Sequence, residues 1–182
     1  MDPLTEAERL YNEARALCPG APNAEAFALL LQAAELDYPP AQHRVGMAYS
    51  RGAGTEKNPE QAVYWFTKAA EAGHAMAQND LGCAYLYGNG VPKDEKVAAQ
   101  WFQQSADQNN AQGITNLGFC YGNGHGVPQD QKKAVELYIR AAEMGVVSAQ
   151  NNVGYAYFYG AGVEQDYEKA VTWYRMAAEK GP

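Results

Sequence analysis

The chain has 182 residues, 47% of them hydrophobic, and a formal charge of −7 at pH 7, which is enough apolar surface for a continuous core. Lysine and arginine do not cluster, so neither nucleic acid nor an anionic membrane surface is an expected partner. No apolar run reaches the roughly 18 to 20 residues that span a bilayer, and the chain does not open with a leader-like pattern. Three irregularly spaced cysteines favour the cytoplasm, although a chain trimmed of its leader would look the same.

Residues 1–40 are expected to form a capping pair of helices. The pattern predicts helices near 3–17 and 23–37, separated by a loop with two prolines and a glycine over residues 18–23. Seven acids and two arginines give this part a net charge of −5. Such a charge suits the end of a repeat array that faces water.

From residue 41 onward, a glycine-rich phrase recurs every 36 residues, beginning at Arg51, Tyr87, Asn123 and Tyr159. Each unit reads as helix, glycine loop, helix, so repeats are expected at 41–76, 77–112, 113–148 and 149–182, and the last could be truncated. The sequence therefore predicts one all-α solenoid domain of about ten antiparallel helices. The helices of these repeats are expected near 40–51, 59–72, 76–87, 94–108, 112–122, 130–144, 148–159 and 166–180.

The second helix of each repeat carries small and aromatic residues at spacings of three, four and seven, as an amphipathic helix does. Bulky rings such as Trp101 are expected to pack against alanine and glycine of the partner helix. The expected N-cap residues occupy the same position in each repeat. Residues able to adopt a left-handed conformation are expected to end each of these helices. The N-caps are Asn58, Asp94, Asp130 and Asp166, and the closing residues are Gly73, Asn109, Gly145 and Gly181.

The final helix, with Trp173 and Tyr174, has no following helix in this sequence to cover its outer side. We therefore expect either that the natural protein continues or that this end self-associates.

The phrase Ala77-Gln78-x-x-Leu81-Gly82-x-x-Tyr85-x-x-Gly88-x-Gly90-Val91-x-x-Asp94 resembles the Sel1-like repeat, a relative of the tetratricopeptide repeat. The resemblance covers residues 41–181, with weaker likeness before them. It implies a right-handed superhelix whose first helices line a concave face, and a role as adaptor or scaffold. Some bacterial members with cysteine pairs bridging each helix pair are linked to β-lactam binding, but this chain has no such pairs.

A variable stripe on the first helices, at about 100° per residue, is expected to lie opposite their packing face. Amides there could bond a peptide backbone, and the apolar side chains could anchor it. The alternative is that Phe119, Tyr155 and Phe158 simply pack between neighbouring helices. The groove residues expected are His43, Met47, Asn79, Cys83, Leu86, Thr115, Asn116, Phe119, Asn151, Asn152, Tyr155 and Phe158.

Relatives that grip a terminal carboxylate use several basic residues on this surface, whereas only Arg44 and Arg51 lie nearby here. A neutral extended segment is therefore the expected guest, or a basic partner if the acidic N-terminal part takes part.

The histidines, His43, His74 and His125, fall in different phases of the repeat, so neither a metal site nor a cofactor is expected. Cys120 stands where other repeats have alanine and is expected in the core.

We expect a non-catalytic scaffold. The alternatives are a hydrolase with an unrecognised site, by family analogy, and a structural spacer with a smooth polar surface.

Overall fold

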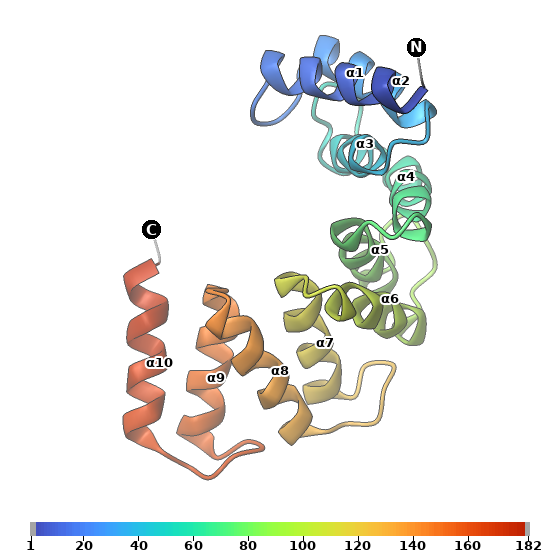
Figure 1. The fold of residues 1–182 in the computed structure, drawn as a ribbon. Helices are drawn as coiled ribbons and strands as arrows, with labels where there is room; N and C mark the ends of the chain where they lie inside the picture. The colour runs from blue at the N-terminus through green and yellow to red at the C-terminus, as the bar shows by residue number, and fades with distance from the viewer. Residues whose placement is uncertain (1–2, 181–182) are drawn as a thin grey trace. The chain divides into compact units, whose positions relative to one another are not determined.

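The computed structural model describes residues 3–180, which form ten helices and no strands (Figure 1). Each described helix begins and ends within two residues of the expected bounds, so the all-α solenoid class is confirmed. The helices are α1 Pro3–Leu17, α2 Ala24–Glu35, α3 Pro39–Arg51, α4 Pro59–Glu71, α5 Ala75–Tyr87, α6 Glu95–Asp107, α7 Ala111–Asn123, α8 Gln131–Glu143, α9 Val147–Tyr159 and α10 Tyr167–Lys180.

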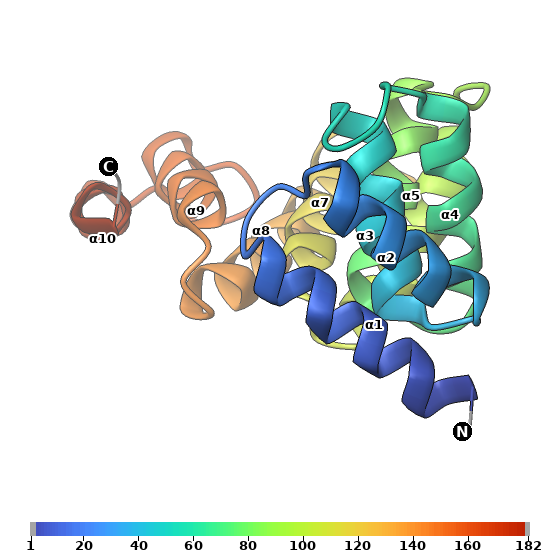
Figure 2. The same cartoon turned by 90° about the horizontal axis from the view of Figure 1, so that it is seen from above.

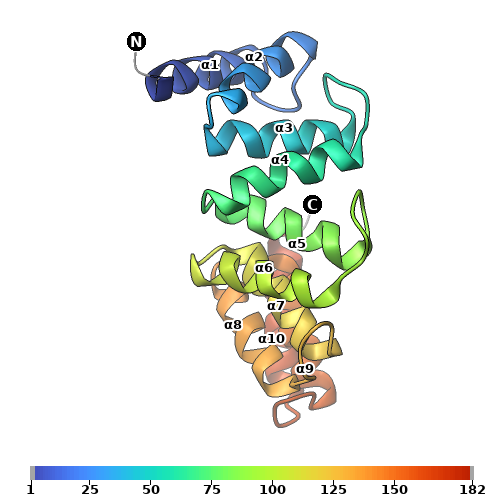
Figure 3. The same ribbon diagram turned by 90° about the vertical axis from the view of Figure 1, so that its right-hand side faces the viewer.

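The helices group into two compact units, here called unit 1 (residues 1–94) and unit 2 (residues 95–182). In unit 1, helices α1 to α5 pack in chain order, each against the next, and Figure 3 shows α3 and α4 side by side. In unit 2, helices α6 to α10 pack in the same consecutive way, and Figure 2 shows α9 next to α10. Consecutive packing of this kind is typical of a repeat array.

Side-chain caps fix where the second helices begin. The Asn58 side chain accepts a hydrogen bond from the Gln61 amide at 3.0 Å, and Asp130 and Asp166 accept equivalent bonds from Lys133 and Lys169, each at 2.9 Å. These caps satisfy amides that the helix itself leaves unpaired.

The second helices end in left-handed residues, as the sequence predicted for Gly73, Asn109 and Gly145, whose φ angles are 85°, 58° and 91°. Gly181 lies outside the described residues. Asp37 adopts the same conformation, with φ 56°. Asp37 and Asn109 are therefore non-glycine residues in a conformation that asparagine and aspartate tolerate better than most.

The core pairs large rings with small residues, as expected. The Phe66 ring lies 2.6 Å from the place where a Cβ on Gly46 would stand, so only glycine allows this approach. The rings of Trp65, Phe66 and Phe102 are buried, but Trp101 and Trp173 are only partly buried. Among the neighbouring rings of α6, Phe102 is therefore more deeply buried than Trp101.

A buried glutamine recurs near the start of the first helices and ties them to the preceding second helix. Each glutamine side chain donates a hydrogen bond to one backbone carbonyl oxygen. The pairs are Gln42 with Ala34 at 3.2 Å, Gln78 with Ala70 at 3.1 Å and Gln150 with Ala142 at 3.2 Å. Such bonds satisfy backbone carbonyls at the helix end. In α7 the equivalent position holds Ile114, which is buried, so that junction is apolar instead.

The second glycine of each loop lies against the backbone at the start of the preceding second helix. A Cβ on Gly90 would collide with the Pro59 carbonyl group, and a Cβ on Gly162 would collide with that of Gln131. Both glycines also have left-handed backbone, with φ of 75° and 77°. The loop therefore requires glycine there for two independent steric reasons.

Candidate functional site

The first-helix side of unit 1 holds a cavity of about 430 Å³. Its lining residues come from α1, α3, the start of α5 and the loops after α1 and α3. A smaller cavity of about 180 Å³ adjoins it and is lined by α3, α4, α5 and the loop after α5. Met47 and Arg51 line both cavities. Met47, one of the expected groove residues, is therefore partly exposed between two hollows.

His43, at the same helix surface, is not a free groove side chain. It is 5% exposed, and its Nε2 lies 2.8 Å from Oδ2 of Asp80 on α5. Its ring stands 5.8 Å from that of Phe66 and 4.9 Å from that of His74, centroid to centroid. The expected exposure of His43 is therefore wrong, because a first helix in a stacked array also contacts the first helix of the next pair.

The same correction applies to three other expected groove residues, since Asn79, Leu86 and Thr115 are also buried. The Thr115 hydroxyl donates to the Ala111 carbonyl oxygen of its own helix at 2.8 Å. Cys83 is partly buried and lines the smaller cavity of unit 1. The stripe is thus accessible at some positions and part of the packing at others.

In unit 2, the accessible part of the stripe lies on α7 and α9. Asn116, Phe119 and Asn152 are partly buried, and the Phe119 ring stacks on His125 with 5.3 Å between centroids. His125 also pairs with Glu95, its Nδ1 3.1 Å from Oε1. The loop histidine therefore packs against Phe119 and pairs with Glu95.

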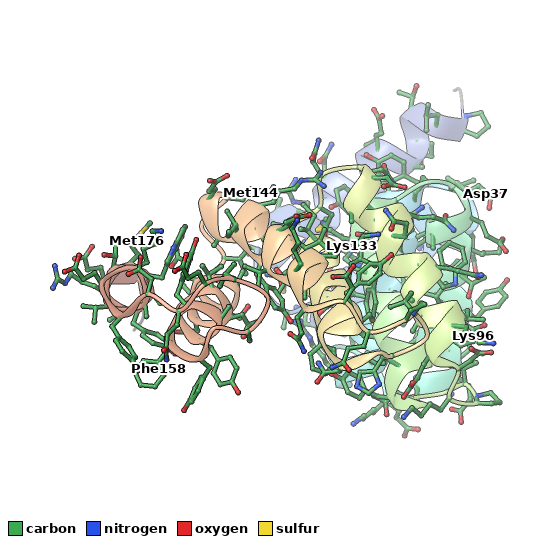
Figure 4. All side chains as sticks on the ribbon, turned by 90° about the horizontal axis from the view of Figure 1, so that it is seen from below. Asp37, Lys96, Lys133, Met144, Phe158 and Met176 are labelled. Carbon is green, nitrogen blue, oxygen red and sulfur yellow. The ribbon has the colours of Figure 1, made fainter. Side chains whose placement is uncertain are left out.

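The outer face of α9 displays the most exposed aromatic residues of the stripe. Tyr155 is 56% exposed, Phe158 is 42% exposed, and Asn151 beside them is exposed as well. Tyr155 lies 4.6 Å and Phe158 lies 4.8 Å from the Tyr159 ring, and Phe158 also lies 5.3 Å from Tyr167. Figure 4 shows Phe158 projecting outward from α9. These side chains, here called the α9 aromatic face, form a contiguous apolar surface beside an amide.

Burial shifts the pKa values of Cys120 and His74 away from their ordinary values. Burial raises the pKa of the Cys120 thiol to about 11, and Cys120 is fully buried, as expected of a core residue. Burial, and then the neighbouring His43, lower the pKa of His74 to about 4, while its Nδ1 accepts from the Ala77 amide at 3.3 Å. A nucleophilic thiol needs a lowered pKa, so Cys120 does not meet that requirement.

Within residues 3–180, no group of three or more His, Cys, Asp or Glu residues is placed to hold a metal ion. None of the helices in that range is both long enough and apolar enough to cross a membrane.

Sequence reasoning missed two polar features of unit 1. The first is the His43–Asp80 pair, whose partners are 37 residues apart, about one repeat, so the repeat period offered a signal. The second is Arg44, whose Nη2 donates to the Gly20 carbonyl oxygen at 2.8 Å. No sequence pattern gives the path of the loop that brings Gly20 there.

The family model described as Sel1 repeat matches residues 23–38, 39–74, 75–110, 111–146 and 147–182. Among solved structures, a Sel1 repeat protein from Oxalobacter formigenes is similar to this chain, with 32% sequence identity and a TM-score of 0.85, over 100% of this chain and 74% of that one. A protective antigen present in uropathogenic Escherichia coli strains, with an SLR fold, is 29% identical with a TM-score of 0.84.

The match to the E. coli antigen covers 97% of this chain but 38% of that protein. The immunity protein Pa5087 from Pseudomonas aeruginosa is similar in fold, with 22% identity and a TM-score of 0.62 over 94% of this chain and 64% of that one. No curated protein matches the chain.

Proposed function

The chain belongs to the Sel1 repeat family, whose members generally mediate protein–protein interaction, and we propose that it is a non-catalytic scaffold that binds an extended peptide segment of a partner protein. The binding surface is the first-helix side of each unit. The observation that carries the proposal is the α9 aromatic face, where two large rings stand exposed next to the Asn151 amide. Aromatic anchors supply affinity, while amides can bond a peptide backbone.

The groove residues of the proposal are those that a guest can reach. In unit 1 they are Met47 and Cys83, and in unit 2 they are Asn116, Phe119, Asn151, Asn152, Tyr155 and Phe158. The four buried members of the original stripe are assigned to packing. Among the described residues, Cys18, Cys83 and Cys120 form no disulfide bond, which supports a reducing compartment, the cytoplasm, as the place where the protein acts.

One side of α10 supports a second kind of contact, with another copy of this chain. Tyr167, Val171 and Tyr174 follow one another at spacings of four and three, which places them on the same side of the helix, and all three are exposed. Met176 is exposed on a different side of α10, where Figure 4 shows it projecting from the helix. Exposed apolar patches of this kind mark interaction surfaces.

The proposal is tested with a random peptide library whose peptides are fused through their carboxyl ends to the display particle. We expect selected peptides to bind the wild-type chain. Their affinity for the Tyr155→Ala, Phe158→Ala double variant should be at least tenfold lower. The matched control is Tyr64→Ala with Tyr87→Ala, which removes two rings outside the stripe that are 50% and 64% exposed. Peptides that bind the groove variant as tightly as wild type would contradict the proposal.

A further inference from the structure

The larger cavity of unit 1 combines an apolar lining with positive charge. Tyr11, Pro22, Met47 and Met76 contribute apolar surface, and the cavity volume is about 430 Å³. That volume falls in the range of about 300 to 1,000 Å³ typical of ligand pockets. Among the described residues, those lining it include two arginines and no aspartate or glutamate. Its chemistry therefore suits an apolar group that carries a negative charge.

The two arginines face this cavity from one side of α3. Arg44 and Arg51 are seven residues apart, which is about two helical turns and places them on the same face. The bond from Arg44 Nη2 to the Gly20 carbonyl oxygen, at 2.8 Å, holds that guanidinium at the cavity and leaves its remaining N–H groups available. Arg51 is exposed and also lines the cavity, so its guanidinium group is accessible to a ligand.

The other ionisable groups nearby do not compete for this role. His74 lines the cavity but is neutral at pH 7, because burial and the neighbouring His43 lower its pKa to about 4. Asp80 lines the smaller cavity, where its Oδ2 is 2.8 Å from His43 Nε2. The positive charge at the larger cavity therefore comes from the two guanidinium groups, which bind carboxylates through paired N–H groups.

We propose that this cavity binds the C-terminal residue of a partner protein, with its apolar side chain against Met47 and Met76 and its terminal carboxylate on Arg44 and Arg51. The inference deepens the proposed function and rests on it, since it assigns an end of the bound segment to the first-helix side of unit 1. It also revises the sequence-based expectation of a neutral guest, which rested on there being only two arginines.

A protein tail fits better than a free carboxylic acid because the site does not end at one cavity. Met47 and Arg51 also line the smaller cavity, together with the polar side chains of Ser50 and Asn89. A chain whose last residue fills the larger cavity can continue over Met47 into the smaller one, where hydroxyl and amide groups can bond its backbone. A free acid would use the larger cavity alone.

The test titrates two N-acetylated tetrapeptides, Ser-Gly-Leu-Leu as the free acid and as the C-terminal amide, into protein labelled at the methionine methyl groups for NMR. We expect the acid to shift the Met47 and Met76 signals in a saturable way, while Met144 and Met176 of unit 2 stay still. The amide should bind at least tenfold more weakly. N-acetyl-leucine, the small-acid arm, should also bind at least tenfold more weakly than the tetrapeptide acid.

The variant Arg51→Gln should lose at least fivefold in affinity for the tetrapeptide acid. The matched control, Arg175→Gln, removes an exposed arginine of unit 2 and should bind like wild type. Equal binding of acid and amide, unchanged binding by Arg51→Gln, or no shift at Met47 and Met76 would overturn the assignment of the carboxylate site. Equal binding of N-acetyl-leucine would overturn the protein tail as its source.

These outcomes are separable from the proposed function. The display library presents peptides without a free carboxyl end, and its test variant lies on α9 in unit 2. Peptide capture that depends on the α9 aromatic face, together with no preference for acid over amide, would remove this inference and leave the scaffold function standing.

Discussion

Removing the two rings of the α9 aromatic face should cost the protein little stability. The comparison is between the Tyr155→Ala, Phe158→Ala double variant and the single variant Ile114→Ala, all in unit 2. Tyr155 and Phe158 are 56% and 42% exposed, whereas Ile114 is 0% exposed. The comparison decides between the two interpretations that the sequence left open, a binding surface and plain packing between helices.

The expected magnitudes follow from burial. Truncating a buried isoleucine to alanine costs about 2 to 5 kcal/mol, because apolar contact is lost and a cavity remains. The exposed rings lose mainly their contacts with Tyr159 and Tyr167, at 4.6 to 5.3 Å between centroids. Aromatic pairs of this kind contribute about 0.5 to 1.5 kcal/mol each, and their exposure lowers the loss, so we expect about 1 to 2 kcal/mol for the double variant.

Urea unfolding followed by circular dichroism measures both variants against wild type. Because repeat arrays can unfold in parts, amide hydrogen exchange should accompany it and show whether α9 alone or all of unit 2 loses protection. A double variant as unstable as Ile114→Ala, or one that exposes the amides of α7 and α8, would show that the rings are core and that no free aromatic surface exists there.

Two further predictions concern pH and assembly. Because the folded pKa of His74, about 4, lies below its ordinary 6.5, the stability it contributes is present above pH 6.5 and is lost as pH falls toward 4. His74→Asn keeps a capping side chain, as Asn110 does in the next repeat, and should lose less unfolding free energy over that range; an identical pH profile would contradict the assignment. Sedimentation should show the wild-type chain associating with rising concentration and the Val171→Glu variant remaining monomeric. A wild-type chain that is monomeric at every concentration would refute self-association through α10.

The helix bounds could be predicted closely because the same boundary signal occurs once in each repeat and can be compared between repeats. Asn58, Asp130 and Asp166 share one phase, and each accepts the capping bond expected of it. A cap is a local interaction spanning three residues, so the sequence alone contains all of its determinants.

The candidate surface was predicted less well, because exposure depends on which helices are neighbours. Helical periodicity places His43 and Met47 on one stripe, yet one is buried against Asp80 and the other is partly exposed between two cavities. A first helix contacts the partner helix of its own pair and the first helix of the next pair, and angular position around one helix does not separate these contacts from open surface.

The two arginines of α3 also show that sequence periodicity alone does not define a binding site. The seven-residue spacing of Arg44 and Arg51 was visible in the sequence, and it places both on one face of α3. What the sequence did not show is the loop carbonyl of Gly20 that holds Arg44 and helps to enclose the cavity. Loop geometry of this kind depends on tertiary packing rather than on a periodic pattern.

The fit of the second loop glycine, as at Gly90 against Pro59 and Gly162 against Gln131, bears on how such a protein can change its length. Each loop is accommodated by the helix start of the pair just before it. A duplicated block of 36 residues would therefore contain both partners of this contact, the loop glycine and the helix start against which such a glycine packs. Evolution can lengthen such an array by gene-segment duplication without inventing a new joint, while the inserted copy remains free to diverge on its accessible surface.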